Sequence, residues 1–218
     1  MQFKEYKIAP LSGKTGSTVL FLHGLGDHGD GGLLEIGRIW QRALPDSEFI
    51  CPDAPFPFDM APPDFGGRQW FSLREFSQAS VEQGVREAAP FLNAYIDGIL
   101  AARKLSANKL ALVGFSQGTM MALHVGLRRA DPIAALVGYS GMLAAPQTLA
   151  AEKKSAPPIL LIHGEQDEVV PFPSMEAAAG ALKAAGISSS TLPCPHLGHS
   201  IDDIGIHAGM QFLQQYLN

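Results

Sequence analysis

Short apolar runs alternate with longer segments of helical periodicity along most of the chain. The runs are rich in β-branched and aromatic residues, which is typical of buried strands. They predict strands over residues 6–9, 18–22, 49–51, 110–113, 134–139, 159–162 and 190–193. Apolar residues at helical spacing predict helices over residues 33–44, 81–100, a run beginning after 118, 174–185 and 204–217. This alternation predicts an α/β fold, with a mainly parallel sheet and helices on both faces.

The same alternation continues to the end of the 218-residue chain, without an internal repeat, a low-complexity tract or a long linker. Hydrophobic residues make up 46% of the sequence and charged residues 17%, which is enough apolar material for a large core. We therefore expect residues 1–218 to form one domain. Pro90 lies inside the longest predicted helix and should kink or divide it.

Two loops interrupt the pattern. Five of the ten residues from His23 to Gly32 are glycine, so backbone N–H groups can approach a ligand closely. Part of this loop fits the bare dinucleotide pattern G-x-G-x-x-G, but Asp27 and Asp30 would crowd a pyrophosphate with negative charge. An oxyanion-binding loop is the better interpretation.

The second loop contains five prolines between residues 52 and 63, which should exclude regular structure and give a stiff surface excursion. Aromatic residues are concentrated in this loop and just after it: Phe56, Phe65, Trp70 and Phe71. Aromatic side chains gathered in a loop favour a pocket wall, so Trp70 and Phe71 are candidate substrate-binding residues.

A G-x-S-x-G motif, residues 114–118, lies between a predicted strand and a predicted helix. In a nucleophile elbow the serine takes a strained conformation at this turn, and the glycines let strand and helix approach. Ser116 is therefore the candidate nucleophile, and the N–H of Gln117 can stabilise a developing oxyanion. Ser140 is a rival serine at a strand end, but Met142 stands where the second glycine would be.

A serine nucleophile needs a base in contact with it and an acid that orients the base. In enzymes with a nucleophile elbow, the acid follows the serine in the chain and the histidine follows the acid. This order leaves His196, His199 and His207 as candidate bases. His207 falls inside a predicted helix, whereas Gly198 gives the backbone the freedom to aim His199. His199 is therefore the predicted base.

The candidate acids are Glu165, Asp167 and Glu168, which cluster after one predicted strand. Asp167 is favoured because the short turn at the strand end presents it and apolar packing resumes at Val169 and Val170. The sequence therefore predicts one catalytic triad: Ser116, Asp167 and His199.

Together these segments resemble the phospholipase/carboxylesterase family of the α/β-hydrolase superfamily, which includes the acyl-protein thioesterases. The matching segments follow the family's order and extend over nearly the whole chain: residues 22–27, 52–55, 70–71, 114–118, 140–141, 163–171 and 198–199. The resemblance implies a single α/β-hydrolase domain without a large lid. It also implies Ser116 as nucleophile, His199 as base, Asp167 as its partner, and oxyanion donors from the backbone of Leu25 and Gln117. Ser72 is a departure, because many family members carry aspartate after the Trp-Phe pair.

The expected function is that of a serine carboxylesterase that hydrolyses carboxylic esters, and also thioesters, through an acyl-serine intermediate. An acyl-protein thioesterase or a lysophospholipase is the alternative. A dienelactone-type enzyme would carry cysteine in the elbow, and a binding protein with this fold would commonly have lost a triad member. No metal or other cofactor is expected, since the histidines lack H-E-x-x-H or similar spacing.

The remaining composition bears on partners and compartment. A net charge of −5 argues against a nucleic-acid surface. No apolar run is long enough to span a membrane, and the first residues lack the layout of a signal peptide. Cys51 and Cys194 imply no disulfide framework. We expect a cytoplasmic monomer or homodimer whose partner is a small-molecule ester or thioester.

Overall fold

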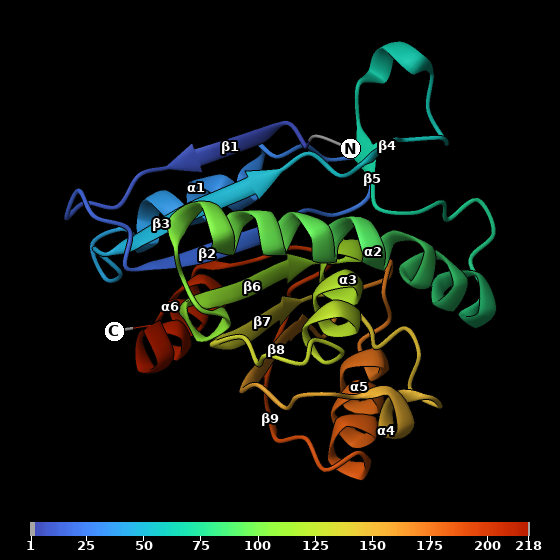
Figure 1. Cartoon of the computed structure of the whole chain (residues 1–218). Coiled ribbons are helices and arrows are strands. Elements are labelled where there is room, and N and C mark those ends of the chain that lie inside the picture. Colours follow the sequence, from blue (N-terminus) through green and yellow to red (C-terminus); the bar gives the residue numbers. More distant parts are fainter. Residues whose placement is uncertain (1–2, 218) are drawn as a thin grey trace.

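A seven-stranded sheet forms the centre of the computed structural model, which describes residues 3–217 (Figure 1). Its strand order is β1-β3-β2-β6-β7-β8-β9, and only β1 runs antiparallel to its neighbour. The strands are β1 Glu5–Ile8, β2 Ser17–Leu22, β3 Ser47–Pro52, β6 Leu110–Phe115, β7 Ala135–Tyr139, β8 Ile159–Gly164 and β9 Ser189–Cys194. All seven predicted strands are confirmed. Because six strands run in parallel, the loops at their carboxyl ends gather at one edge of the sheet.

Helices cover both faces of this sheet, as the alternation predicted (Figure 1). They are α1 Gly32–Trp40, α2 Gln78–Arg103, α3 Gln117–Gly126, α4 Leu149–Glu152, α5 Pro173–Ala184 and α6 Asp203–Leu217. Buried side chains of α2, α3 and α5 pack with Leu20 and Leu22 of β2, whereas α1 and α6 pack with Val19 and Phe21. Neighbouring strand residues thus enter opposite cores, which is why the central strands read as continuous apolar runs.

The prediction for Pro90 was a kink or a division of the helix, and the division does not occur, because α2 runs unbroken from Gln78 to Arg103. The proline ring is exposed, while the apolar stripe on the other side stays packed on the sheet. A capping box between Ser77 and Ser80 also fixes the start of this helix. The proline-rich loop is not wholly irregular, since β4 (Phe56–Pro57) pairs antiparallel with β5 (Arg68–Gln69).

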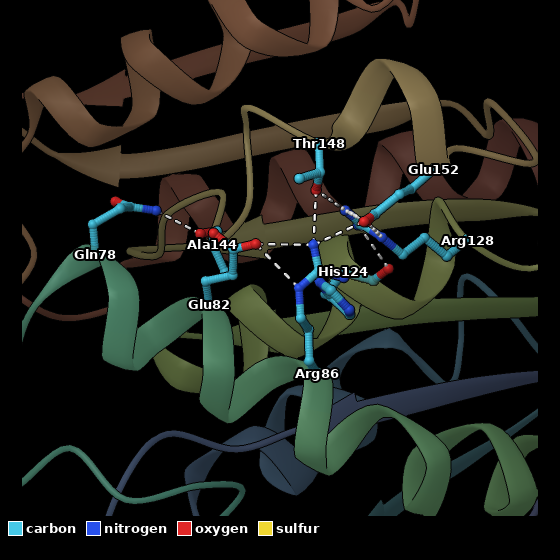
Figure 2. Close-up of polar contacts among 8 residues, drawn as sticks. All are labelled: Gln78, Glu82, Arg86, His124, Arg128, Ala144, Thr148 and Glu152. Carbon is cyan, nitrogen blue, oxygen red and sulfur yellow. Dashed lines mark hydrogen bonds and ion pairs between the residues drawn. The ribbon is translucent and has the colours of Figure 1, made fainter.

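A network of ionic hydrogen bonds joins α2, α3 and α4 (Figure 2). Arg86 of α2 and Arg128, just after α3, each donate to the Glu152 carboxylate at 2.8 Å. Arg86 also donates to the Thr148 hydroxyl at 2.9 Å. The hydrogen bond from Arg86, with that from Arg128, lowers the pKa of Glu152 to about 2. The network therefore ties the short helix α4 to the rest of the fold.

His124 lies beside this network (Figure 2), is only 4% exposed, and its Nδ1 has no hydrogen-bond partner among the described residues. Burial, followed by the positive charges of Arg128 and Arg86, lowers the pKa of His124 to about 4, and Glu152 only partly opposes this. The unfolded chain, where histidine titrates near 6.5, therefore binds a proton in a pH range where the folded protein does not. Stability is consequently lost as the pH falls from about 6.5 towards 4.

Replacing His124 by leucine is expected to remove this acid sensitivity. Between pH 7.5 and 5, the free energy of unfolding should fall by about 2 kcal/mol less in H124L than in the parent protein. Urea unfolding at the two pH values measures the difference. H207L, the same change at an exposed histidine of α6, is the control and should retain the parent slope. Equal slopes in H124L and the parent would contradict the burial argument.

Candidate active site

Ser116 occupies the sharp turn between β6 and α3. Its backbone angles, φ 53° and ψ −116°, lie in a region that non-glycine residues rarely adopt. A hydrogen bond to the neighbouring strand β7 stabilises the turn, because the Ser116 N–H donates to the Tyr139 carbonyl at 2.9 Å. A Cβ at Gly118 would lie 1.8 Å from the Leu22 carbonyl oxygen, so only glycine lets the helix approach β2 this closely. These features are those of a nucleophile elbow.

Asp167 and His199 come from the ends of β8 and β9 and meet at the same edge of the sheet. His199 Nδ1 lies 2.8 Å from Asp167 Oδ2, and the aspartate side chain is fully buried. Asp167 Oδ1 accepts hydrogen bonds from the N–H groups of Val169 and Val170, both at 2.9 Å. Burial alone would raise the pKa of Asp167, but the hydrogen bonds from His199 and from these backbone groups hold it below its ordinary value. The carboxylate therefore stays ionised and orients the His199 ring.

His163 makes a second contact with this carboxylate that the sequence did not reveal. Its Nε2 lies 2.8 Å from the Val170 carbonyl and 3.2 Å from Asp167 Oδ2. A carbonyl oxygen can only accept a hydrogen bond, so Nε2 carries the proton and points at both oxygens. The sequence placed His163 beside the sheet at a strand end, and it is buried there.

Ser116 and His199 line one cavity of about 380 Å³. Most of its other lining side chains are apolar: Leu25, Met60, Leu73, Phe76, Phe115, Met120, Val169 and Val170. The rival base candidates lie elsewhere, because His196 and His207 are exposed and neither lines this cavity. The rival acids Glu165 and Glu168 are exposed as well, whereas Asp167 is buried. The arrangement places a serine hydroxyl, an imidazole and an apolar surface together.

The glycine-rich loop brings Leu25 to the same cavity. The N–H groups of Gly26 and Asp27 donate to backbone carbonyls, but the Leu25 N–H donates to no acceptor among residues 3–217. Gln117 opens helix α3, so its N–H has no partner within the helix. The loop is fixed at its start by buried His23, whose Nδ1 donates to Gly24 and whose Nε2 accepts from Ala54. Burial lowers the pKa of His23, which keeps this neutral tautomer.

The sequence profile of the phospholipase/carboxylesterase family matches residues 4–218. The chain belongs to that family. It is accordingly a serine hydrolase that acts on esters or thioesters, on the α/β-hydrolase fold.

Individual proteins resemble this chain along nearly its full length. Acyl-protein thioesterase 1 of Schizosaccharomyces pombe is 30% identical over 209 residues, which cover 91% of this chain and 90% of the relative. The crystal structure of esterase PE8 is 35% identical, with a TM-score of 0.94 and 100% of both chains covered. The crystal structure of Arabidopsis thaliana SOBER1 is 26% identical, with a TM-score of 0.82 over 93% of this chain and 99% of that one.

Trp70 and Phe71 line a different cavity from the one that contains Ser116, and their contact with substrate stays a prediction. Both are buried, at 0% and 4% exposure, and both line a cavity of about 780 Å³ together with Phe56 and Phe91. The Trp70 N–H donates to the Gln117 side-chain oxygen at 2.8 Å, and the Gln117 amide donates to the Phe71 carbonyl at 2.8 Å. Their backbone therefore anchors Gln117, the residue after the elbow serine.

The described part of the chain offers neither an evident metal site nor a membrane span. Within residues 3–217, no group of three His, Cys, Asp or Glu side chains is arranged to hold a metal ion. No helix in this range is both long and apolar enough to cross a bilayer.

Proposed function

We propose that the protein is a carboxylesterase that works through an acyl-serine intermediate, with Ser116 as nucleophile, His199 as base and Asp167 as its orienting partner. One observation carries the proposal. A serine in a strained elbow shares a cavity wall with a histidine whose other ring nitrogen is bound by a buried, ionised carboxylate. This combination supplies the base and the orientation that a serine hydroxyl needs to attack a carbonyl carbon.

The reaction then has two halves. Ser116 Oγ attacks the acyl carbonyl as its proton passes to His199 Nε2, and the intermediate collapses when the C–O or C–S bond breaks. The leaving alcohol or thiol takes that proton from His199. Water next attacks the acyl-serine, gives a proton to His199 and releases the carboxylic acid, while Ser116 Oγ recovers its proton. The sum is ester plus water giving acid plus alcohol.

The negative charge that develops on the carbonyl oxygen needs donors already in place. Leu25 lines the cavity, and Gln117 directly follows Ser116 at the start of α3; each N–H donor of this kind contributes roughly 3–4 kcal/mol in comparable sites. Both groups belong to segments held by other contacts, His23 at one side and the Trp70–Phe71 backbone at the other. The donors are therefore preorganised for the transition state.

Two measurements test this proposal together. A fluorophosphonate probe should attach to Ser116, which mass spectrometry of the digested protein identifies. Hydrolysis of p-nitrophenyl esters from acetate to palmitate, and of the matching acyl thioesters, then defines acyl length and the preference for oxygen or sulfur. Thioester substrates are included because relatives of this chain are named acyl-protein thioesterases. Labelling of another residue, or ester hydrolysis that survives full labelling, would refute the mechanism.

The apolar wall of the cavity should bind the acyl chain. Each methylene group removed from water stabilises binding by about 0.8 kcal/mol, so a charge in this wall penalises longer chains selectively. In L73D, the ratio of kcat/KM for octanoate to that for acetate should fall by at least about tenfold. L11D places the same charge at an exposed leucine outside the cavity and should keep the parent ratio. An unchanged ratio in L73D would place the acyl chain elsewhere.

A further inference from the structure

A second cavity, of about 360 Å³, borders the first on the side of His199. The two cavities share Asp27, Phe115 and His199, but Ser116 lines only the first. The Phe115 ring, whose centroid lies 4.8 Å from that of His199, belongs to both walls. The second cavity therefore reaches the base without reaching the nucleophile.

Apolar side chains from three separate segments form most of this second cavity. Leu33 and Ile36 come from α1, Ile201 from the loop after His199, and Ile206 from α6. Leu33 and Ile36 are buried, while Ile201 and Ile206 are only partly covered. An apolar surface of this size, next to a candidate base and open to solvent, matches a small-molecule subsite.

The chemistry of ester cleavage decides which part of a substrate would lie there. The acyl chain extends along the cavity of Ser116, and the carbonyl oxygen turns to the N–H groups of Leu25 and Gln117. The leaving oxygen or sulfur must lie within reach of His199, which protonates it. Because Asp167 holds Nδ1, the Nε2 atom is the one free to make this transfer. The group attached to the leaving atom therefore departs on the His199 side.

We propose that the second cavity is the leaving-group subsite and that it takes apolar alcohols or thiols that are neutral or cationic. The inference rests on the proposed function, since it needs His199 as the proton donor. Asp27 is the only fully charged side chain among the lining residues, and its Oδ1 is held by the His28 N–H at 2.8 Å. No arginine or lysine lines the cavity to balance it. A leaving group bearing carboxylate or phosphate meets this charge without a partner.

The test uses four butyrate esters that differ only in the alcohol: ethyl, benzyl, 4-carboxybenzyl and 4-(aminomethyl)benzyl. Each kcat/KM is divided by the rate of hydroxide-catalysed hydrolysis, which removes intrinsic reactivity. The benzyl ester should exceed the ethyl ester by about tenfold or more, as expected when an apolar group enters a matching pocket. The carboxybenzyl ester should be slower than the aminomethylbenzyl ester by at least about tenfold.

Variants assign these preferences to the second cavity. I206S should reduce the benzyl-to-ethyl ratio by at least about threefold while the octanoate-to-acetate ratio stays at its parent value. D27N should reduce the ratio of kcat/KM for the aminomethylbenzyl ester to that for the carboxybenzyl ester by at least about threefold. I39S, at an exposed isoleucine of α1 outside both cavities, is the matched control and should change neither ratio.

The outcomes separate this inference from the proposed function. Hydrolysis with Ser116 labelled, but with a flat leaving-group profile or ratios insensitive to I206S and D27N, overturns the subsite alone. Failure of the parent protein to cleave any of the four esters, with Ser116 unlabelled, overturns both.

Discussion

Replacing Ser116 by alanine is expected to lower kcat/KM for p-nitrophenyl butyrate by about 10⁴-fold or more, with the fold intact. Alanine removes the only atom that forms the acyl intermediate, and what remains is catalysis by the oxyanion donors and by substrate binding. The turn itself should persist, because Gly114 and Gly118 still permit the close approach of β6 and α3. Steady-state kinetics measure the loss, and thermal unfolding shows that the variant is folded.

Ser140 supplies the matched control for this experiment. It too ends a strand with a positive φ, 46°, and it is buried, but it does not line the cavity. S140A should therefore retain most of the activity. The reverse ranking, with S140A inactive and S116A active, would show that the wrong serine has been assigned. H199A combined with S116A should be little worse than S116A alone, since the two groups act as a unit.

The elbow could be predicted from sequence because its signals are local. A buried strand, two glycines and a helical run occupy consecutive residues, and the steric demands that select them are met within that stretch. The proximity of Asp167 and His199 follows from topology, since both end parallel strands that pair with one another in the sheet. Pattern and chain order were sufficient for these features.

The surroundings of the site depend on packing that periodicity does not encode. Trp70 and Phe71 were expected to line a pocket, and they line a cavity other than that of Ser116, since their position is decided by packing with α2 and α3. The contact between His163 and Asp167 depends on the path of the chain between them, which the apolar pattern leaves open. Helix α4 is a single turn and is held by Arg86 and Arg128 from other elements, so no local periodicity marks it.

The second cavity could not be predicted from the periodicity of the sequence either. Its walls come from the glycine-rich loop, α1, β6, the loop after β9 and the start of α6, and no single segment carries its signature. In the sequence, Ile36 and Ile206 are ordinary core positions of amphipathic helices. Only the folded structure places them in one cavity with His199.

Gly118→Ala is expected to lower stability more than the addition of a methyl group at any other glycine of the elbow. In an ordinary helix this change stabilises by about 0.5–1 kcal/mol, because alanine restricts the unfolded chain more than glycine does. Here the new Cβ would lie 1.8 Å from the Leu22 carbonyl oxygen and 2.4 Å from its carbon, and both are backbone atoms of the central strand β2. Neither atom can move without displacing the strand that leads into the glycine-rich loop. Destabilisation of several kcal/mol follows, at the upper end of what single substitutions produce.

Thermal unfolding of G118A beside G180A tests this expectation. Gly180 lies in helix α5, and a Cβ there would meet nothing within 4 Å, so G180A should gain about 0.5–1 kcal/mol. Any G118A that still folds should also lose at least about 100-fold in kcat/KM. The displaced strand end carries Leu25 away from the carbonyl oxygen, and misplacement by about 1 Å is enough for a loss of that size. Parent-like stability in G118A would mean that α3 and β2 can move apart enough to admit a methyl group. The close packing of Gly118 on Leu22 would then not explain why Ser116 keeps its strained conformation.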